Sequence, residues 1–164
     1  PTASVATNTT QLATTAFVLA NKGGMTLLGT LTTTSGTSHS LTNIAAGYRK
    51  LYIEFDGVSG TSTGITTNVS LSSTNGAAYG TIHPLTSSTV VAANTLDGWI
   101  EIGNISSTIA NAKTVIKSLQ NGGTILAIAA GLVPTNTAAV VDAIQFSITA
   151  NAFDAGSIRI YGVK

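Results

Sequence analysis

The residues around position 99 are the strongest candidates for binding chemistry in this chain. Trp99 is the only tryptophan among 164 residues. Strict alternation places it on the face opposite Ile100 and Ile102. Glu101 shares the face of Trp99, and Asp97 lies shortly before it. Because an aromatic ring stacks on the C–H face of a sugar while polar groups bind its hydroxyls, the segment predicts a sugar-binding surface. The alternative is that Trp99 fills a contact between subunits.

A second polar and aromatic segment, AAYGTIHP, carries Tyr79 and His83. We expect these two side chains, from the same or an adjacent subunit, to assist the site around Trp99. The other histidine is His39. If three copies of the chain met at a three-fold axis, one histidine from each copy could together bind a divalent cation. The alternative for either residue is an ordinary hydrogen-bonded histidine in a loop. No metal site and no other cofactor is predicted.

Hydrolytic chemistry has few candidate groups. No Gly-x-Ser-x-Gly turn surrounds any serine. Two pairs of carboxylates lie close in sequence, Glu54 with Asp56 and Asp97 with Glu101, and two carboxyls are the minimum for glycoside hydrolysis. Residues at i and i+2 of a strand, however, simply share its solvated face. The sequence therefore predicts no catalytic residue.

The composition argues against several classes of function. Only 8% of residues are charged and the net charge is +1. The composition therefore predicts no strongly basic surface that would attract nucleic acid or an anionic membrane. The longest apolar run, residues 125–133, is far too short to insert across a bilayer. Cysteine is absent, while 43% of residues are hydrophobic and the mean hydropathy is +0.37. Few charges and many small residues fit a protein that buries surface against copies of itself.

Residues 8–21 read as a short helix, which forms the main part of an N-terminal stalk of residues 1–24. Asn8 is a plausible N-cap, and Gly23 or Gly24 can end the helix. An isolated helix of this length is marginal in water, so it needs a partner: its own domain or copies of itself. Alternating steps of four and three residues define the seam of a short coiled coil, formed by Val5, Thr9, Leu12, Ala16 and Leu19.

Residues 25–164 read as β-structure. Apolar and polar residues alternate in short segments, and clusters of Gly, Ser, Asn and Thr separate them. No second helical pattern follows the first, which favours an antiparallel β-sandwich of the jelly-roll-like kind. The alternating segments are 51–56, 69–72, 99–102, 144–149 and 158–161.

Three segments resemble a known family. The opening PTASVATNTTQLATTAFV resembles a segment that recurs in bacteriophage tail fibre proteins just before a C-terminal head. The closing FDAGSIRIYGVK is similar to the final strand of such heads, and SLTNIAAGYRKLYIEFDGVSG is similar to their first long strand pair. Because equivalents of Tyr161 recur in heads expected to have different receptors, this residue is expected to be structural.

The resemblance implies a homotrimer, in which a stalk of three helices (residues 1–24) leads into three β-sandwich heads (residues 25–164). It implies a receptor-binding protein of the virion, at the phage tail, that acts outside the cell. The expected partners are a bacterial cell-surface polysaccharide or lipopolysaccharide and the upstream fibre or other virion proteins. The alternatives are a structural tail or baseplate module without its own receptor and a small polysaccharide hydrolase or esterase.

Overall fold

The computed structural model describes residues 24–62, 66–80, 82–85, 95–109, 113–122, 124–132, 139–149 and 151–164. Within these residues all regular elements are β-strands. The predicted stalk helix and its seam from Val5 to Leu19 lie outside these residues. No helix in the described segments has the length and hydropathy needed to cross a membrane. The strands are β1 (Met25–Thr32), β2 (Ser38–Leu41), β3 (Lys50–Gly60), β4 (Thr67–Ser72), β5 (His83–Pro84), β6 (Leu96–Gly103), β7 (Thr114–Asn121), β8 (Thr124–Leu132), β9 (Ala143–Ile148) and β10 (Phe153–Val163).

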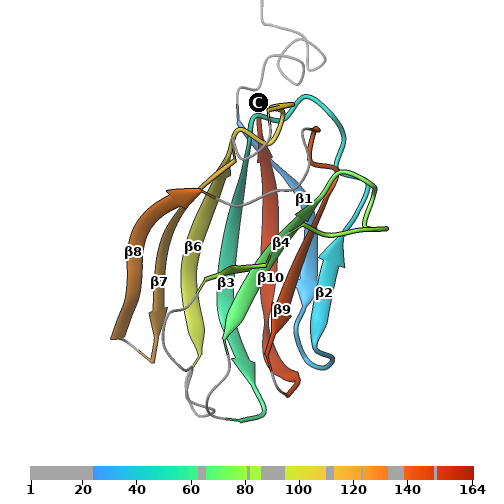
Figure 1. Ribbon diagram of the computed structural model, residues 1–164. Coiled ribbons are helices and arrows are strands. Elements are labelled where there is room, and N and C mark those ends of the chain that lie inside the picture. Colours follow the sequence, from blue (N-terminus) through green and yellow to red (C-terminus); the bar gives the residue numbers. More distant parts are fainter. Residues whose placement is uncertain are drawn as a thin grey trace, which may run out of the picture.

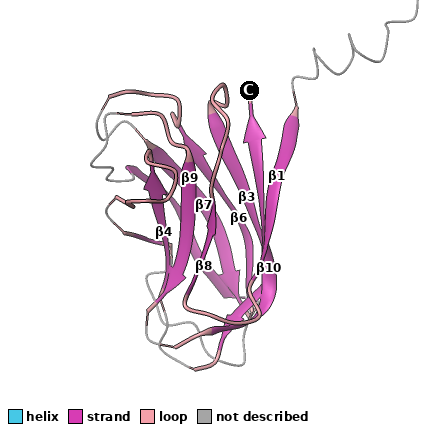
Figure 2. Cartoon of the chain, turned by 90° about the vertical axis from the view of Figure 1, so that its right-hand side faces the viewer, coloured by secondary structure: helices cyan, strands magenta, loops and turns pink. Residues whose placement is uncertain are grey.

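Two antiparallel sheets form the two layers of the molecule. The larger sheet has six strands in the order β1-β10-β3-β6-β7-β8, and the smaller has four in the order β2-β9-β4-β5. Figure 1 shows β8, β7 and β6 on the left, β4 crossing β3 and β10 near the centre, and β9 and β2 on the right. In Figure 2 the strands of the two sheets stand in separate layers. The prediction of a mainly β chain with antiparallel sheets is therefore confirmed.

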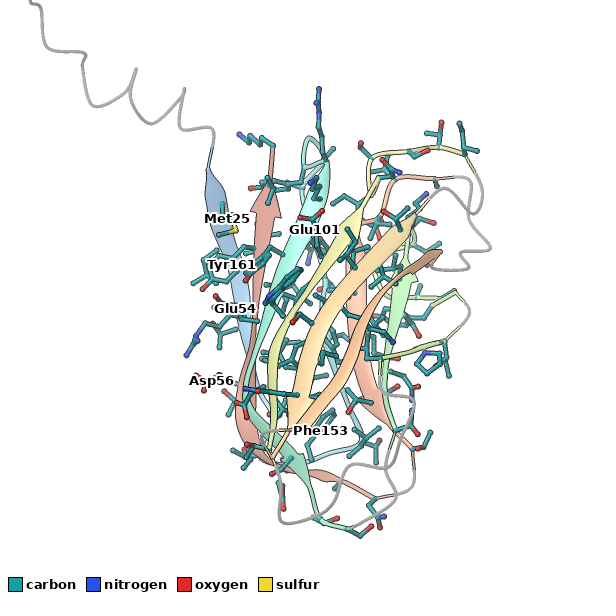
Figure 3. All side chains as sticks on the ribbon, turned by 90° about the vertical axis from the view of Figure 1, so that its left-hand side faces the viewer. Met25, Glu54, Asp56, Glu101, Phe153 and Tyr161 are labelled. Carbon is teal, nitrogen blue, oxygen red and sulfur yellow. The ribbon has the colours of Figure 1, made fainter. Side chains whose placement is uncertain are left out.

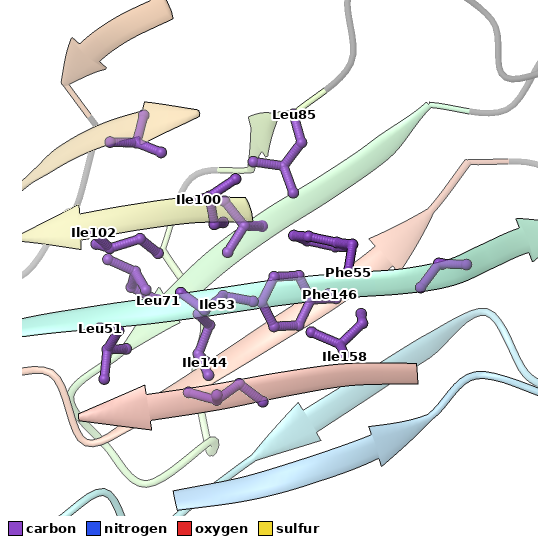
Figure 4. Close-up of a cluster of buried hydrophobic side chains, with 14 of the residues drawn as sticks. Leu51, Ile53, Phe55, Leu71, Leu85, Ile100, Ile102, Ile144, Phe146 and Ile158 are labelled. Atoms are coloured by element: carbon purple, nitrogen blue, oxygen red, sulfur yellow. The ribbon is translucent and has the colours of Figure 1, made fainter. Parts of the chain in front are cut away.

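The hydrophobic core lies between the two sheets. On β3, Leu51, Ile53 and Phe55 point inward and are at most 3% exposed, as the period of two in this segment predicts. Phe146 of β9 crosses from the other sheet and meets Phe55 edge to face, with ring centroids 5.5 Å apart. Figure 4 shows these side chains interdigitating with isoleucines and leucines of both sheets. The alternate residues of β3, β6 and β10 must then face away from the core.

Two lysines point into the sandwich. Lys113, just before β7, is 0% exposed. Its Nζ donates hydrogen bonds to the carbonyl oxygens of Ser107 at 2.7 Å and Ala139 at 3.0 Å. The Nζ of Lys117 on β7 donates to the carbonyl oxygen of Leu85 at 2.9 Å. These carbonyls lie outside the regular strands, so the two lysines tie loop segments at the edge of the sandwich to the larger sheet.

Because Lys113 and Lys117 point into the sandwich, we expect the free energy of unfolding to depend on pH. Burial lowers the pKa of Lys113 and Lys117 below their ordinary value of 10.5. Between the lowered value and 10.5 the unfolded chain binds more protons than the folded chain, so the free energy of unfolding rises with pH. Above 10.0 the tyrosines contribute in the opposite direction, because desolvation raises the pKa of Tyr52 and Tyr161 above that ordinary value and the folded chain then binds more protons. Above 10.5 only this destabilising contribution remains. We expect the free energy of unfolding, measured with urea from pH 7 to 11, to be highest at about pH 10.

The variant Lys113→Met isolates the lysine contribution. Methionine retains an apolar chain of similar length but has no proton to bind or release, so the rise in unfolding free energy below pH 10.5 should become shallower. A parent protein whose stability falls steadily from pH 7 to 10 would contradict the prediction.

Candidate functional site

The outward side chains of β10, β3 and β6 form one polar and aromatic surface. In one row across these strands, Tyr161 lies opposite Tyr52, which lies opposite Glu101. In the next row the residues are Arg159, Glu54 and Trp99. Figure 3 shows Tyr161, Glu54 and Asp56 along the same side of the sheet, with Met25 beyond them on β1. We call this surface the aromatic face, formed by Lys50, Tyr52, Glu54, Asp56, Trp99, Glu101, Arg159 and Tyr161.

Three aromatic rings occupy the centre of the aromatic face. The rings of Tyr52 and Trp99 stack with centroids 5.7 Å apart and an interplanar angle of 24°. Tyr161 meets Tyr52 at 6.3 Å with an angle of 53°. All three side chains are half-buried, so each ring leaves part of its surface in contact with solvent. The alternation of residues predicts that Trp99 points outward, as observed. Tyr52 was not among the predicted site residues, and Tyr161 was expected to be structural.

Carboxylates and an arginine border the rings on one side. The guanidinium of Arg159 lies 2.8 Å from the Oδ2 of Asp56 and 3.8 Å from the Oε2 of Glu54. The Tyr161 hydroxyl donates a hydrogen bond to the same Glu54 oxygen at 3.2 Å. Desolvation and this hydrogen bond both raise the pKa of Tyr161, and the negative charge of Glu54 raises it further. Tyr161 therefore stays a neutral hydrogen-bond donor at physiological pH.

A second ion pair borders the rings on the other side. Lys50 Nζ lies 2.9 Å from Oε1 of Glu101, and both side chains remain partly exposed. Desolvation, followed by the charges of Glu54 and Tyr161, raises the pKa of Tyr52. The Tyr52 hydroxyl is therefore protonated as well. Glu101, predicted as a binding residue, thus lies on the aromatic face together with Trp99.

Asp97 has a structural role that the sequence did not reveal. One of its carboxylate oxygens accepts a hydrogen bond from the backbone N–H of Gly57 at 2.7 Å. The other accepts one from the Thr95 hydroxyl at 2.7 Å. Gly57 lies in an irregularity of the β3–β6 pairing, between Phe55 and Val58, where the register shifts. Asp97 supplies the acceptor that the interrupted ladder does not give to Gly57.

A hollow of about 250 Å³ opens beside Trp99. Its floor forms at Gly98, whose φ of +123° is rarely adopted by residues with a side chain. A Cβ at this position would lie 2.2 Å from the carbonyl oxygen of Ser118, so only glycine fits. The Ser118 hydroxyl and the Gln120 amide add uncharged hydrogen-bonding groups to the lining. None of these three residues was singled out from the sequence, because their meeting depends on the pairing of β6 with β7.

Tyr79 and His83 belong to the other layer of the molecule. His83 starts β5 and pairs with Val69 of β4, in the four-stranded sheet. Tyr79 lies in the loop after β4, and the N–H of Gly80 donates to the Leu71 carbonyl oxygen, which holds this loop against β4. Within one chain the structure therefore does not bring these two residues together with Trp99.

The remaining histidine also has ordinary neighbours. His39 on β2 has its Nε2 2.8 Å from the carbonyl oxygen of Ser35, and its ring centroid lies 5.2 Å from that of Phe153. Across the described segments, no three side chains of the metal-binding types gather in one group.

Comparisons with protein-family models, curated proteins and solved structures found no match to this chain. Stacked rings offer a surface for the C–H groups of a ligand, and carboxylates beside them accept hydrogen bonds from hydroxyl groups.

Proposed function

We propose that this chain is the receptor-binding tip of a bacteriophage tail fibre and adheres to a bacterial surface polysaccharide or lipopolysaccharide without cleaving it. The observation that carries the proposal is the partly exposed group of Tyr52, Trp99 and Tyr161, in which the Tyr161 hydroxyl donates a hydrogen bond to the carboxylate of Glu54. Rings bordered by acceptors suit a ligand with apolar C–H faces and many hydroxyl groups. The family resemblance of the chain ends supplies the biological setting.

The proposed assembly is a homotrimer with a three-helix stalk of residues 1–24 and a jelly-roll-like head of residues 25–164. The described strands fit such a head, because the chain passes repeatedly from one sheet to the other between β1 and β10. Upstream fibre or other virion proteins would hold the stalk. Three weak sites on one head then gain avidity from their high effective concentration, so adhesion needs no tight single site.

Assembly is tested by the mass of the protein in solution. Size-exclusion chromatography with light scattering should give three times 16.5 kDa at micromolar concentration. The variant Leu12→Asp should weaken the trimer, because three carboxylates would meet in an apolar seam at a cost of roughly several kcal/mol each. The matched control is Ile109→Asp, in the loop after β6, where the side chain is 70% exposed. A parent protein that elutes as a clean monomer would overturn the trimer.

Adhesion is tested on immobilised bacterial surface polysaccharides from a panel of strains. The proposed adhesin is retained by some of them, and the length of the retained polymer stays unchanged during incubation. Shortened polymer would instead identify a hydrolase. Retention by none of the polymers would reject the adhesin, and capture by purified virion proteins would then identify a structural module.

A second candidate function has one observation in its favour. On β1, Met25 and Leu27 are 56% and 54% exposed, and Leu27 is paired with Tyr161 at the border of the aromatic face. Exposed apolar side chains next to aromatic rings are also typical of protein–protein contacts. The face would then pack against another subunit or virion protein, as expected of a structural tail or baseplate module. The loss of assembly in a Trp99 variant would distinguish this case.

A further inference from the structure

The cations of the aromatic face are already paired with carboxylates of the same face. The guanidinium of Arg159 lies between Asp56 at 2.8 Å and Glu54 at 3.8 Å. Lys50 contacts Glu101 at 2.9 Å. An anionic group approaching either cation would meet the carboxylate that is already paired with it. The positive charge that each cation offers to a uronate, a phosphate or a sulfate is therefore offset by a neighbouring negative charge.

The charge balance of the aromatic face is negative. Three carboxylates, those of Glu54, Asp56 and Glu101, stand against the two cations Lys50 and Arg159, which leaves an excess of one negative charge. The chain as a whole carries +1, so this local sign is opposite to the net charge. A ligand with a negative charge on each repeat would meet like charge along the face and lose binding energy.

The groups of the aromatic face that remain available suit a ligand that donates hydrogen bonds. A carboxylate has about four lone-pair sites, and the ion pairs occupy only part of them. In the hollow beside Trp99, Ser118 and Gln120 contribute a hydroxyl and an amide, which are uncharged. The aromatic rings provide the apolar surface. These three kinds of group match the hydroxyls and C–H faces of uncharged sugars.

We propose that the aromatic face selects neutral glycans and rejects those that carry uronate, phosphate or other anionic groups. This inference rests on the proposed function, since it names the ligand class of the same site. The glycan lies with its C–H faces against Trp99 and Tyr52, and its hydroxyls donate to the carboxylates of Glu54 and Glu101. Selection against acidic polymers is a consequence of carboxylates that outnumber the cations on the face.

The first test uses surface polysaccharides extracted from a bacterial strain that the parent protein coats. Anion exchange separates them into a neutral and an acidic fraction, and each is immobilised at equal mass. The parent should be retained on the neutral fraction at least about tenfold more strongly. Preferential retention on the acidic fraction, abolished by Trp99→Ala, would overturn the inference while leaving the proposed function standing. Retention on neither fraction would overturn both.

The second test changes the charge of the aromatic face. Asp56→Asn removes the closest partner of Arg159 at a position whose side chain is 60% exposed, so the fold should tolerate it. At low salt the trivalent head should then bind the acidic fraction about tenfold better, and added salt should reverse the gain. Asp142→Asn is the matched control, because it removes the same negative charge outside the aromatic face. The Asp142 carboxylate accepts a hydrogen bond from the backbone N–H of Asn75. An equal gain in both variants, or no gain in Asp56→Asn, would overturn the assignment.

Discussion

If the proposed function is right, the variant Trp99→Ala should lose adhesion to bacterial surfaces, while its oligomeric state and its thermal transition remain close to those of the parent. Trp99 is half-buried and stacks against Tyr52 on the outward face of the sheet. Because Ile100 and Ile102 point into the core, removing the Trp99 ring leaves their packing in place. Removing a stacking ring from a sugar site costs on the order of 1–3 kcal/mol, or about 5- to 150-fold per site. Three sites on the proposed trimeric head would multiply this loss. Retention on immobilised polysaccharide measures it directly.

Ile116→Ala is the matched control for Trp99→Ala. Ile116 lies opposite Glu101 on the neighbouring strand β7 and is 42% exposed. Its truncation removes an exposed apolar side chain beside the aromatic face without removing a ring, so adhesion should stay within about threefold of the parent. A Trp99→Ala protein that dissociates or melts far earlier would place this residue in a subunit interface. One that adheres as well as the parent would place the receptor site elsewhere.

The variant Gly98→Ala should be among the most destabilised single substitutions of this chain. An added Cβ would lie 2.2 Å from the Ser118 carbonyl oxygen and 3.1 Å from the Cα of Leu119, both backbone atoms of β7. The positive φ of +123° adds strain for any residue other than glycine. The two strands would have to separate at this point, so we expect the free energy of unfolding to fall by about 4 kcal/mol or more. Urea unfolding at constant pH is the measurement.

Gly47→Ala separates the two causes of this loss. Gly47 has a positive φ of +107°, yet a Cβ at this position would meet nothing within 4 Å. The substitution should therefore cost only the backbone strain, about 1–3 kcal/mol. Equal losses in Gly47→Ala and Gly98→Ala would show that the close approach of β6 and β7 contributes nothing, which would contradict the structural explanation for Gly98.

The alternation of apolar and polar residues was sufficient to predict which side chains enter the core. Ile53, Ile100 and Ile158 are apolar members of three alternating segments, and each is fully buried. The same reasoning placed Trp99 on the opposite face of its strand. It succeeded because successive side chains of a strand point to opposite sides, a property of the local backbone that needs no knowledge of the neighbouring strands.

The alternation did not identify the two lysines that point into the sandwich. Lys113, just before β7, is fully buried and Lys117 on β7 is half-buried, although lysine is a residue type normally assigned to the surface. Their inward placement depends on loop carbonyls that accept the ammonium hydrogens, and these carbonyls come from distant parts of the chain. No pattern within β7 itself reports such partners.

The sequence by itself therefore determined the strand type, the inward residues and the outward direction of Trp99. The tertiary structure alone decided which outward residues meet there. Tyr52 and Tyr161 join Trp99 because β3 pairs with both β6 and β10 in particular registers. Alternation cannot supply this, because it fixes the face of each residue but not its partner strand, and a shift of register by two residues preserves every face while changing every neighbour.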